Sequence, residues 1–337
     1  MHQVAVLALE SALATHVAGT YEFLSSVPNM WRQLNGIAPK DPVFDVTVCG
    51  LSKGMVTCYN GFCLNADSEI DQITAPDIII IPGIYNTNLT DLDGELPTDL
   101  IDDEARLLAW LINCHKRGSM IMAIGSGNYF LAKAGLVGGC TVTSHWACHG
   151  QMVRSFPDVK WKNSERIILN QDQPLILSIG GGAAWYDGVR HLIGHFSTVA
   201  NATNAAKAYS VFKPSQEQSL YKEFFAPLNH GDDIILDVQG WIHTHYASSK
   251  LITTIELEFP LSPRTLKRRF YRATGFTLIA YVQEVRLKQA KEMLEHASLS
   301  IEDISIAVGY KEQNYFRRMF KLHLGMTPAE YREFYIT

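Results

Sequence analysis

The stretch IEDISIAVGYKEQNYFRRMF, residues 301–320, decides the fold of the last third of this chain. Its apolar residues recur at the offsets that let two helices joined by a tight turn pack against each other. These residues are Ile301, Ile304, Val308, Tyr310, Phe316 and Phe320. The pattern predicts a helix-turn-helix motif, whose second helix can enter the major groove of DNA.

A second copy of the pattern precedes the first, at residues 252–270. Its apolar residues are Ile252, Ile255, Phe259, Leu261, Leu266 and Phe270. The copies are offset by 49 positions from Ile252 to Ile301 and by 50 from Phe270 to Phe320, and the amphipathic stretch 278–294 joins them. Two motifs at this spacing predict an all-helical module in which two helices contact duplex DNA.

Each motif has one expected reading helix. The first is expected to begin at Ser262-Pro263, because serine is a good N-cap and proline suits the first helical position. The second is expected to run from about Lys311 to His323. The side chains expected to contact bases or phosphates are Ser262, Arg264, Thr265, Lys267, Arg268, Lys311, Gln313, Asn314, Arg317, Arg318 and Lys321. The alternative for each of them is an ordinary solvated helix face.

Charge is distributed unevenly along the chain. Residues 261–337 hold 13 Lys/Arg and 8 Asp/Glu, a net charge of +5. The whole chain has 29 Lys/Arg and 34 Asp/Glu, so the remainder holds 29 − 13 = 16 and 34 − 8 = 26, a net charge of −10. A basic module beside an acidic body favours a DNA reader with a separate sensor domain, and chance surface variation is the alternative.

Composition excludes several classes of protein. The 337 residues, 47% hydrophobic and 19% charged, are typical of a globular protein of two or three domains. There is no apolar run of about 18 residues, as a membrane span requires. No basic region precedes the apolar run at residues 1–9, which argues against a signal peptide. Six cysteines without a CxxC pair indicate reduced thiols. We therefore expect a cytoplasmic protein that does not enter the membrane and needs no metal or cofactor.

The N-terminal part alternates between strand-like and helix-like segments. Strands are expected at 4–9, 44–49, 77–82, 120–124 and 175–179, and helices at 14–25, 99–117, 128–134 and from 183 toward 195. The four consecutive isoleucines at 78–81 are typical of a strand buried on both faces. The alternation predicts a mostly parallel sheet covered by helices. We expect domains at 1–212 and 232–337 and a linker at 213–231, where Pro, Gln and Ser break the pattern.

The C-terminal region resembles the DNA-binding domain of AraC/XylS-family transcription regulators. The matching stretches are LSPRTLKRRF (261–270), RLKQAKEML (286–294) and ISIAVGYKEQNYFRRMFKLHLGMTPAEYR (304–332). The resemblance implies seven helices, with both reading helices entering successive major-groove segments on one face of DNA. The first motif departs from the family pattern at Glu256, where a small residue is usual, and at Pro260, so its reading of bases is less secure.

Residues 1 to about 212 resemble the PfpI-type, class I glutamine-amidotransferase-like fold, a flavodoxin-like α/β sandwich. The stretches that carry this resemblance are HVAGTYEF (16–23), IIIIPG (78–83), AIGSGNYFLAKAGLVGG (123–139), TSHW (143–146) and RSFPDV (154–159). The whole chain is similar to the GlxA subfamily, in which such a domain precedes an AraC-type module. Catalytic relatives carry cysteine at a sharp strand-to-helix turn, and here that position is Gly125. Thiol chemistry is therefore excluded, and no catalytic residue is expected.

The same turn is a candidate ligand site. Amides at Gly83, Ile84, Ser126 and Gly127 are expected to receive an anion, and Glu22 to face an amine. The full set of candidate ligand-binding residues is Glu22, Gly83, Ile84, Tyr85, Gly125, Ser126, Asn128, His145, Trp146, Trp185 and Tyr186. For each aromatic residue the alternative is a place in the core.

These observations favour a ligand-responsive transcription regulator, and resemblance makes an activator that recruits RNA polymerase the expected type. The resemblance implies an effector of the amino acid, amine or betaine class. The expected partners are duplex DNA, this effector, RNA polymerase and a second copy of the chain. Two alternatives remain open: an amidase- or deglycase-like enzyme that uses Ser126 and carries a DNA module, and a DNA-binding protein with a vestigial pocket.

Overall fold

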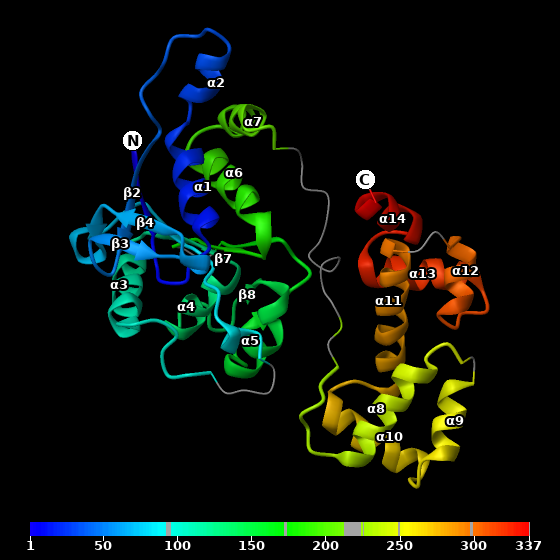
Figure 1. Cartoon of the computed structure of the whole chain (residues 1–337). Coiled ribbons are helices and arrows are strands. Elements are labelled where there is room, and N and C mark those ends of the chain that lie inside the picture. Colours follow the sequence, from blue (N-terminus) through cyan, green and yellow to red (C-terminus); the bar gives the residue numbers. More distant parts are fainter. Residues whose placement is uncertain are drawn as a thin grey trace. The chain divides into compact units, whose positions relative to one another are not determined.

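The computed structural model describes residues 1–91, 96–171, 174–211, 224, 226–248, 250–296 and 299–336. The chain divides into two compact units, Met1–Gln218 and Ser219–Thr337 (Figure 1). The division falls inside the expected linker 213–231, much of which lies outside the described residues. The domain limits expected above therefore stay predictions.

A seven-stranded sheet forms the centre of the first unit. Its order is β10-β11-β7-β6-β1-β2-β5, and each neighbouring pair is parallel except the edge pair β10–β11. The strands are β1 (His2–Leu7), β2 (Phe44–Gly50), β5 (Ser68–Glu69), β6 (Ile78–Ile81), β7 (Met120–Ile124), β10 (Ile167–Asn170) and β11 (Ile176–Ile179). The expected mostly parallel sheet is confirmed.

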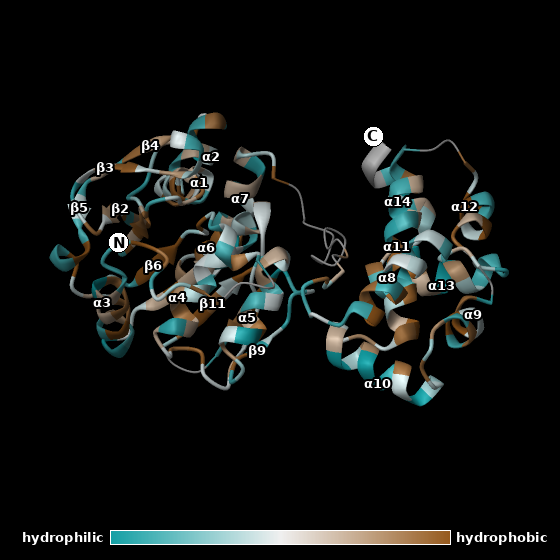
Figure 2. Cartoon of the chain, turned by 60° about the horizontal axis from the view of Figure 1, so that its bottom comes forward, coloured by the Kyte–Doolittle hydropathy of each residue, from teal (hydrophilic) through white to brown (hydrophobic). Residues whose placement is uncertain are grey.

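Both faces of the sheet are covered by helices. The α-helices described in the first unit are α1 (Ala14–Ser25), α2 (Asn29–Leu34), α3 (Glu104–Lys116), α4 (Asn128–Lys133), α5 (His149–Ser155), α6 (Trp185–Phe196) and α7 (Val199–Ala208). α1 and α6 cover one face, and α3 and α4 the other (Figure 1). Every residue of β6 and β7 is buried, which explains their unbroken apolar sequences. The interior strands are hydrophobic while the outer helix faces are hydrophilic (Figure 2).

Two small sheets complete the first unit. β3 (Gly54–Thr57) pairs antiparallel with β4 (Cys63–Ala66), and β8 (Thr141–Val142) pairs parallel with β9 (Lys160–Trp161). α3 begins five residues later than its apolar periodicity predicts. Asp103, just before it, has a left-handed backbone with φ of 54°, which a right-handed helix does not admit.

The second unit contains seven helices within its described residues, as the resemblance implies. They are α8 (Asp233–His245), α9 (Leu251–Glu258), α10 (Pro263–Thr274), α11 (Leu278–His296), α12 (Ile301–Ala307), α13 (Gln313–Leu324) and α14 (Pro328–Ile336). α9 and α10 form the first motif, and α12 and α13 the second. The second reading helix starts two residues later than expected, so Lys311 lies in the turn before it.

The long helix α11 belongs to two hydrophobic cores. Its first half contributes Leu278 and Tyr281 to the core of the first motif. Its second half contributes Ala290 and Leu294 to the core of the second. α11 therefore fixes the two motifs relative to each other. Within the described ranges, no helix combines the length and the hydrophobicity that a bilayer crossing requires.

Candidate ligand site and DNA-binding surface

Gly125 occupies the sharp turn between β7 and α4. Its φ is 56°, a left-handed conformation that glycine adopts without strain. A Cβ at this position would lie 3.6 Å from the Gly180 carbonyl oxygen and 3.7 Å from the His145 Cβ, which are ordinary contacts. The turn thus has the form that exposes a nucleophile, but it carries no side chain to act as one.

Ser126 connects this turn to the loop that follows β6. Its Oγ donates to the Ile84 carbonyl over 2.6 Å and accepts from the Ile84 amide over 2.9 Å, and its side chain is buried. His145 Nδ1 accepts from the Ala147 amide over 3.1 Å. The hydroxyl proton of Ser126 is therefore directed to a carbonyl and not to a base. This geometry disfavours attack by Ser126, since a serine nucleophile needs a base to take its proton.

His16, on α1, is a member of the site that the sequence reasoning missed. Its side chain is buried, and its Nδ1 accepts from the Gly83 amide over 3.1 Å. Burial lowers the pKa of His16 to about 4; a hydrogen bond with the Gly182 backbone opposes this shift, and nearby His145 adds to it. The imidazole is thus neutral at pH 7 and joins two loops at the carboxyl end of the sheet. Its one available signal was a polar residue in the buried stripe of α1.

The backbone amides of Gly83 and Ile84 are not free to bind an anion, contrary to the expectation from the sequence. Each already has an acceptor, His16 Nδ1 and Ser126 Oγ respectively. An anion would have to displace these buried hydrogen bonds, which is costly. The expected anion cradle at these two amides is therefore corrected to an internal hydrogen-bond network.

Glu22 lies on α1, and the aromatic residues Trp185 and Tyr186 lie at the start of α6. Glu22 is exposed, and its carbonyl accepts from the Tyr209 hydroxyl over 3.2 Å. Trp185 packs so closely on α1 that a Cβ at Gly19 would fall 2.4 Å from its ring, and it stacks on Tyr186 at 3.7 Å. Both rings therefore serve helix packing, which is the alternative considered for them above.

The remaining candidates divide between structure and surface. Asn128 is buried, and its Nδ2 lies 3.0–3.1 Å from three carbonyl oxygens, those of Ala123, Gly125 and Ile179, which share its two hydrogens. It holds the turn in place. Tyr85 is half exposed and faces Tyr59 at 4.1 Å between ring centroids. His145 and Trp146 lie side by side, 5.2 Å between centroids, and burial lowers the pKa of His145.

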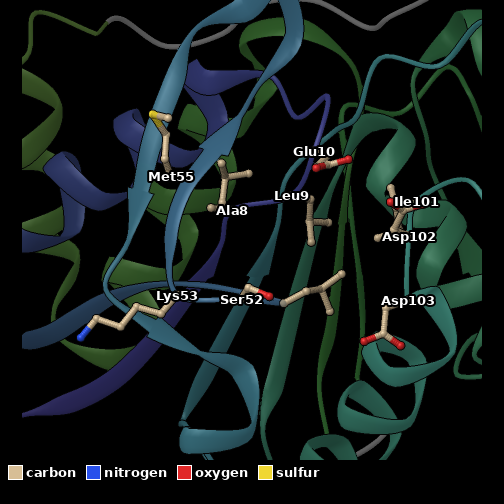
Figure 3. A pocket seen from close by; sticks show the side chains of 11 residues that line it. Ala8, Leu9, Glu10, Ser52, Lys53, Met55, Ile101, Asp102 and Asp103 are labelled. Carbon is tan, nitrogen blue, oxygen red and sulfur yellow. The ribbon is translucent and has the colours of Figure 1, made fainter.

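A cavity of about 280 Å³ lies at another point on the carboxyl edge of the sheet (Figure 3). It adjoins the segments after β1 and β2 and the residues before α3. Its lining combines apolar and acidic side chains: Ala8, Leu9, Glu10, Leu51, Ser52, Lys53, Met55, Val56, Ile101, Asp102 and Asp103. The Lys53 side chain extends away from Glu10 and Asp103 (Figure 3). This edge is where ligands bind in open parallel sheets, but no residue of the expected ligand set lines this cavity.

The first reading helix, α10, begins as expected. Ser262 caps it by accepting from the Thr265 amide over 3.3 Å, and its hydroxyl also bonds that of Thr265. Leu266 and Phe270 are buried, whereas Arg264, Lys267 and Arg268 are exposed. The helix thus presents a cationic face to solvent, with Ser262 and Thr265 engaged in the cap.

The second reading helix, α13, has the same division. Phe316, Phe320 and Leu324 are buried, and the exposed expected contacts are Asn314, Arg317, Arg318 and Lys321, with Gln313 half-buried. The Arg318 guanidinium lies over the Tyr315 ring, 5.4 Å from its centroid. Amide and guanidinium groups on one exposed face suit the hydrogen-bonding edges of bases.

Two half-buried arginines connect the helices of this domain, and the sequence reasoning did not single them out. Arg269 of α10 forms a two-pronged pair with Asp232, the N-cap of α8. Arg286 of α11 donates to the Tyr246 and Ser248 carbonyls over 2.8 and 2.9 Å, and it lies over the Tyr310 ring at 5.3 Å. Arg269 thus holds the reading helix α10 to the start of α8, and Arg286 holds α11 to the segment after α8 and to Tyr310, which precedes α13.

Comparison with known proteins assigns both units to families. A DJ-1/PfpI family model matches residues 40–184, and a helix-turn-helix domain model matches residues 257–333. The transcriptional regulator CdhR of Pseudomonas aeruginosa is 23% identical over 285 residues, 83% of this chain and 79% of that protein. The transcriptional regulator GlxA of Rhizobium meliloti is 27% identical over 297 residues, 86% of each.

Among solved structures, an AraC family transcriptional regulator from Pseudomonas putida aligns with a TM-score of 0.48 at 15% identity, over 62% of this chain and 100% of that one. The two family matches cover different units and lie in the same order as in the sequence reasoning. The chain is therefore an AraC-type regulator in which a DJ-1/PfpI-family domain precedes a C-terminal helix-turn-helix domain.

Proposed function

We propose that this regulator binds duplex DNA through α10 and α13 together, and that a small metabolite bound by the N-terminal domain alters this binding. The observation that carries the proposal is the pair of exposed cationic helix faces fixed to one supporting helix, α11. α11 has 19 residues, so it is about 28 Å long at 1.5 Å per residue. This length is of the same order as the repeat of about 34 Å between successive major-groove segments.

The division of labour within each helix follows from its chemistry. Arg264, Arg268, Arg317 and Arg318 can bond base edges with two parallel hydrogen bonds, and Asn314 can do the same to adenine. Lys311 and Lys321 act as phosphate contacts, which orient the protein without selecting sequence. The net charge of +5 over residues 261–337 supports both roles.

In the N-terminal domain, the proposed role is recognition without catalysis. Gly125 supplies no nucleophile, and the Ser126 proton is donated to the Ile84 carbonyl. The cavity beside β1 and β2 has room for a small ligand, and an amino acid or amine has the required size. The effector must bind the two DNA-binding states unequally, because equal affinity shifts no equilibrium.

The ligand proposal is tested by thermal shift with amino acids, amines and betaines, followed by DNA titration at fixed salt with each compound that binds. Ser52→Tyr places a ring in the cavity mouth, whereas Thr57→Tyr adds the same ring to an exposed strand position that does not line it. We expect Ser52→Tyr to abolish the effect of the ligand on DNA binding and Thr57→Tyr to retain it. Equal responses in both variants would place the ligand elsewhere, and no binding compound would favour a vestigial domain.

Dimerisation and activation complete the proposal. Two copies on one DNA site raise the effective affinity without new contacts, so we expect a homodimer through the N-terminal domain and transcriptional activation through RNA polymerase. Sedimentation tests the first expectation, and transcription in vitro with and without the protein tests the second. A monomer at micromolar concentration, or repression of every bound promoter, would contradict them.

A further inference from the structure

The two helix-turn-helix motifs differ in the contact between their helices. In the first motif, Lys267 Nζ on α10 lies 2.9 Å from Glu256 Oε1 on α9. The Glu256 side chain is only 24% exposed, and its Oε1 is shielded from solvent without a well-aligned hydrogen bond. A partly desolvated carboxylate of this kind needs a cation nearby, and Lys267 supplies it.

The second motif provides an internal comparison. Ile255 and Ile304 are both buried, as are Leu266 and Phe316, so the copies align at these offsets. Glu256 then corresponds to Ser305, and Lys267 corresponds to Arg317. Ser305 is a buried, uncharged residue, and Arg317 is exposed and forms no ion pair within the described part of the chain. The cation at this position is therefore held in one motif and free in the other.

This difference has a consequence for DNA binding, since a phosphate or base contact by Lys267 requires it to leave Glu256. The carboxylate also repels phosphates that approach α10. We infer that Glu256 is an electrostatic restraint on the first reading helix, so that α13 is the stronger anchor and α10 the weaker one. The inference rests on the proposed binding of DNA by both helices.

The expected size of the restraint is modest. Lys267 is 57% exposed, and exposed ion pairs are worth about 0.2–1 kcal/mol, which corresponds to a factor of about 1.4–5 in an equilibrium constant. Release of Lys267 also adds up to one phosphate contact. The logarithmic dependence of affinity on salt concentration should then steepen by up to about 0.9.

The test compares variants of the full chain on a 40-base-pair duplex that the wild type selects from random sequence. Glu256→Ser makes the first motif like the second, and Glu256→Gln removes the charge while keeping the shape. Glu258→Ser is the matched control, because Glu258 lies on the same helix, is exposed, and forms no ion pair among the described residues. We expect both Glu256 variants to bind about 1.4- to fivefold more tightly with a steeper salt dependence, and the control to change less.

A double-substitution cycle identifies Lys267 as the released group. In the wild-type background, Lys267→Ala should weaken DNA binding only slightly. In the Glu256→Gln background, it should cancel the gain in DNA affinity. Weaker or unchanged binding by Glu256→Gln, or an equal cost of Lys267→Ala in both backgrounds, would overturn the inference. Failure of the proposed function is a different result, in which the wild type itself selects no duplex, or selects one to which Arg317→Ala binds with unchanged affinity.

Discussion

At the scale of single residues, the site at the carboxyl end of the sheet is defined by side chains that hydrogen-bond to the backbone of neighbouring loops. His16, Ser126 and Asn128 each bond backbone atoms of loops at this end of the sheet. Buried polar groups that are fully paired stabilise one arrangement of the loops, and removing one partner leaves the other unsatisfied. These residues therefore act through the fold, which makes their substitution measurable as stability.

Ser126→Ala removes a donor and an acceptor at once. The amide and the carbonyl of Ile84 both lose their Ser126 partner, so we expect a loss of about 1–3 kcal/mol in the free energy of unfolding. Urea unfolding followed by tryptophan fluorescence measures it, because five of the six tryptophans precede residue 212. Ser52→Ala, at an exposed serine, is the control, and equal stability of the two variants would refute the structural role of Ser126.

His16 predicts a pH dependence. Its pKa falls from an ordinary 6.5 to about 4 in the fold because burial disfavours the charged form, so the unfolded chain binds the proton more tightly. The neutral imidazole therefore imposes no penalty on the free energy of unfolding above pH 6.5. As the pH falls toward 4, the free energy of unfolding decreases by up to about 3 kcal/mol because of this group. We expect His16→Gln, which does not titrate there, to show a shallower loss of stability over this range. An unchanged slope would contradict the assignment.

At the scale of elements, the long and strongly patterned segments were predictable, and the short or irregular ones were not. β7 and α1 have the predicted limits, since an apolar run flanked by breakers leaves few alternatives. β10 was not predicted, because its half-buried sequence at the sheet edge has no distinctive alternation. Glu22 was chosen on α1 by resemblance, but the residue that turns toward the site is His16, and this choice depends on helix rotation.

The contact between α8 and α10 is a testable element-scale feature. Asp232 caps α8 and pairs with Arg269, whose hydrogen bonds hold the pKa of Asp232 below its usual 3.8. We expect Asp232→Asn to lose the ion pair alone, and Asp232→Ala to lose the cap as well, a further cost of about 1 kcal/mol. Urea unfolding monitored by far-UV circular dichroism gives the free energy of unfolding of each variant.

The ion pair between Asp232 and Arg269 also makes the stability of the fold depend on pH. A carboxyl with a lowered pKa stabilises the fold above its unfolded pKa of 3.8, and the contribution disappears as the pH falls through the lower folded value. The difference between wild type and Asp232→Asn should therefore be present at pH 5 and should narrow below pH 4. A difference that persists at low pH would show that the ion pair is not its cause.

At the scale of the whole molecule, the order of the two domains and the tandem motif could be inferred from spacing and resemblance, because each depends on long patterns. The cavity beside β1 and β2 could not be inferred. It is formed by Glu10, Ser52 and Asp102, from three segments that are far apart in sequence and brought together by parallel pairing. The identity of the ligand likewise depends on side-chain positions that no local pattern encodes.

The most direct test is a hydroxyl-radical footprint on a duplex selected by the wild type, repeated with Arg264→Ala/Arg268→Ala and with Arg317→Ala/Arg318→Ala. We expect two protected segments one helical turn apart on one face of the DNA, each lost with its own pair of arginines, and a loss of about 1–3 kcal/mol in binding free energy for each base contact removed. A single protected segment that neither double variant alters would contradict the claim that this regulator reads DNA with two helices.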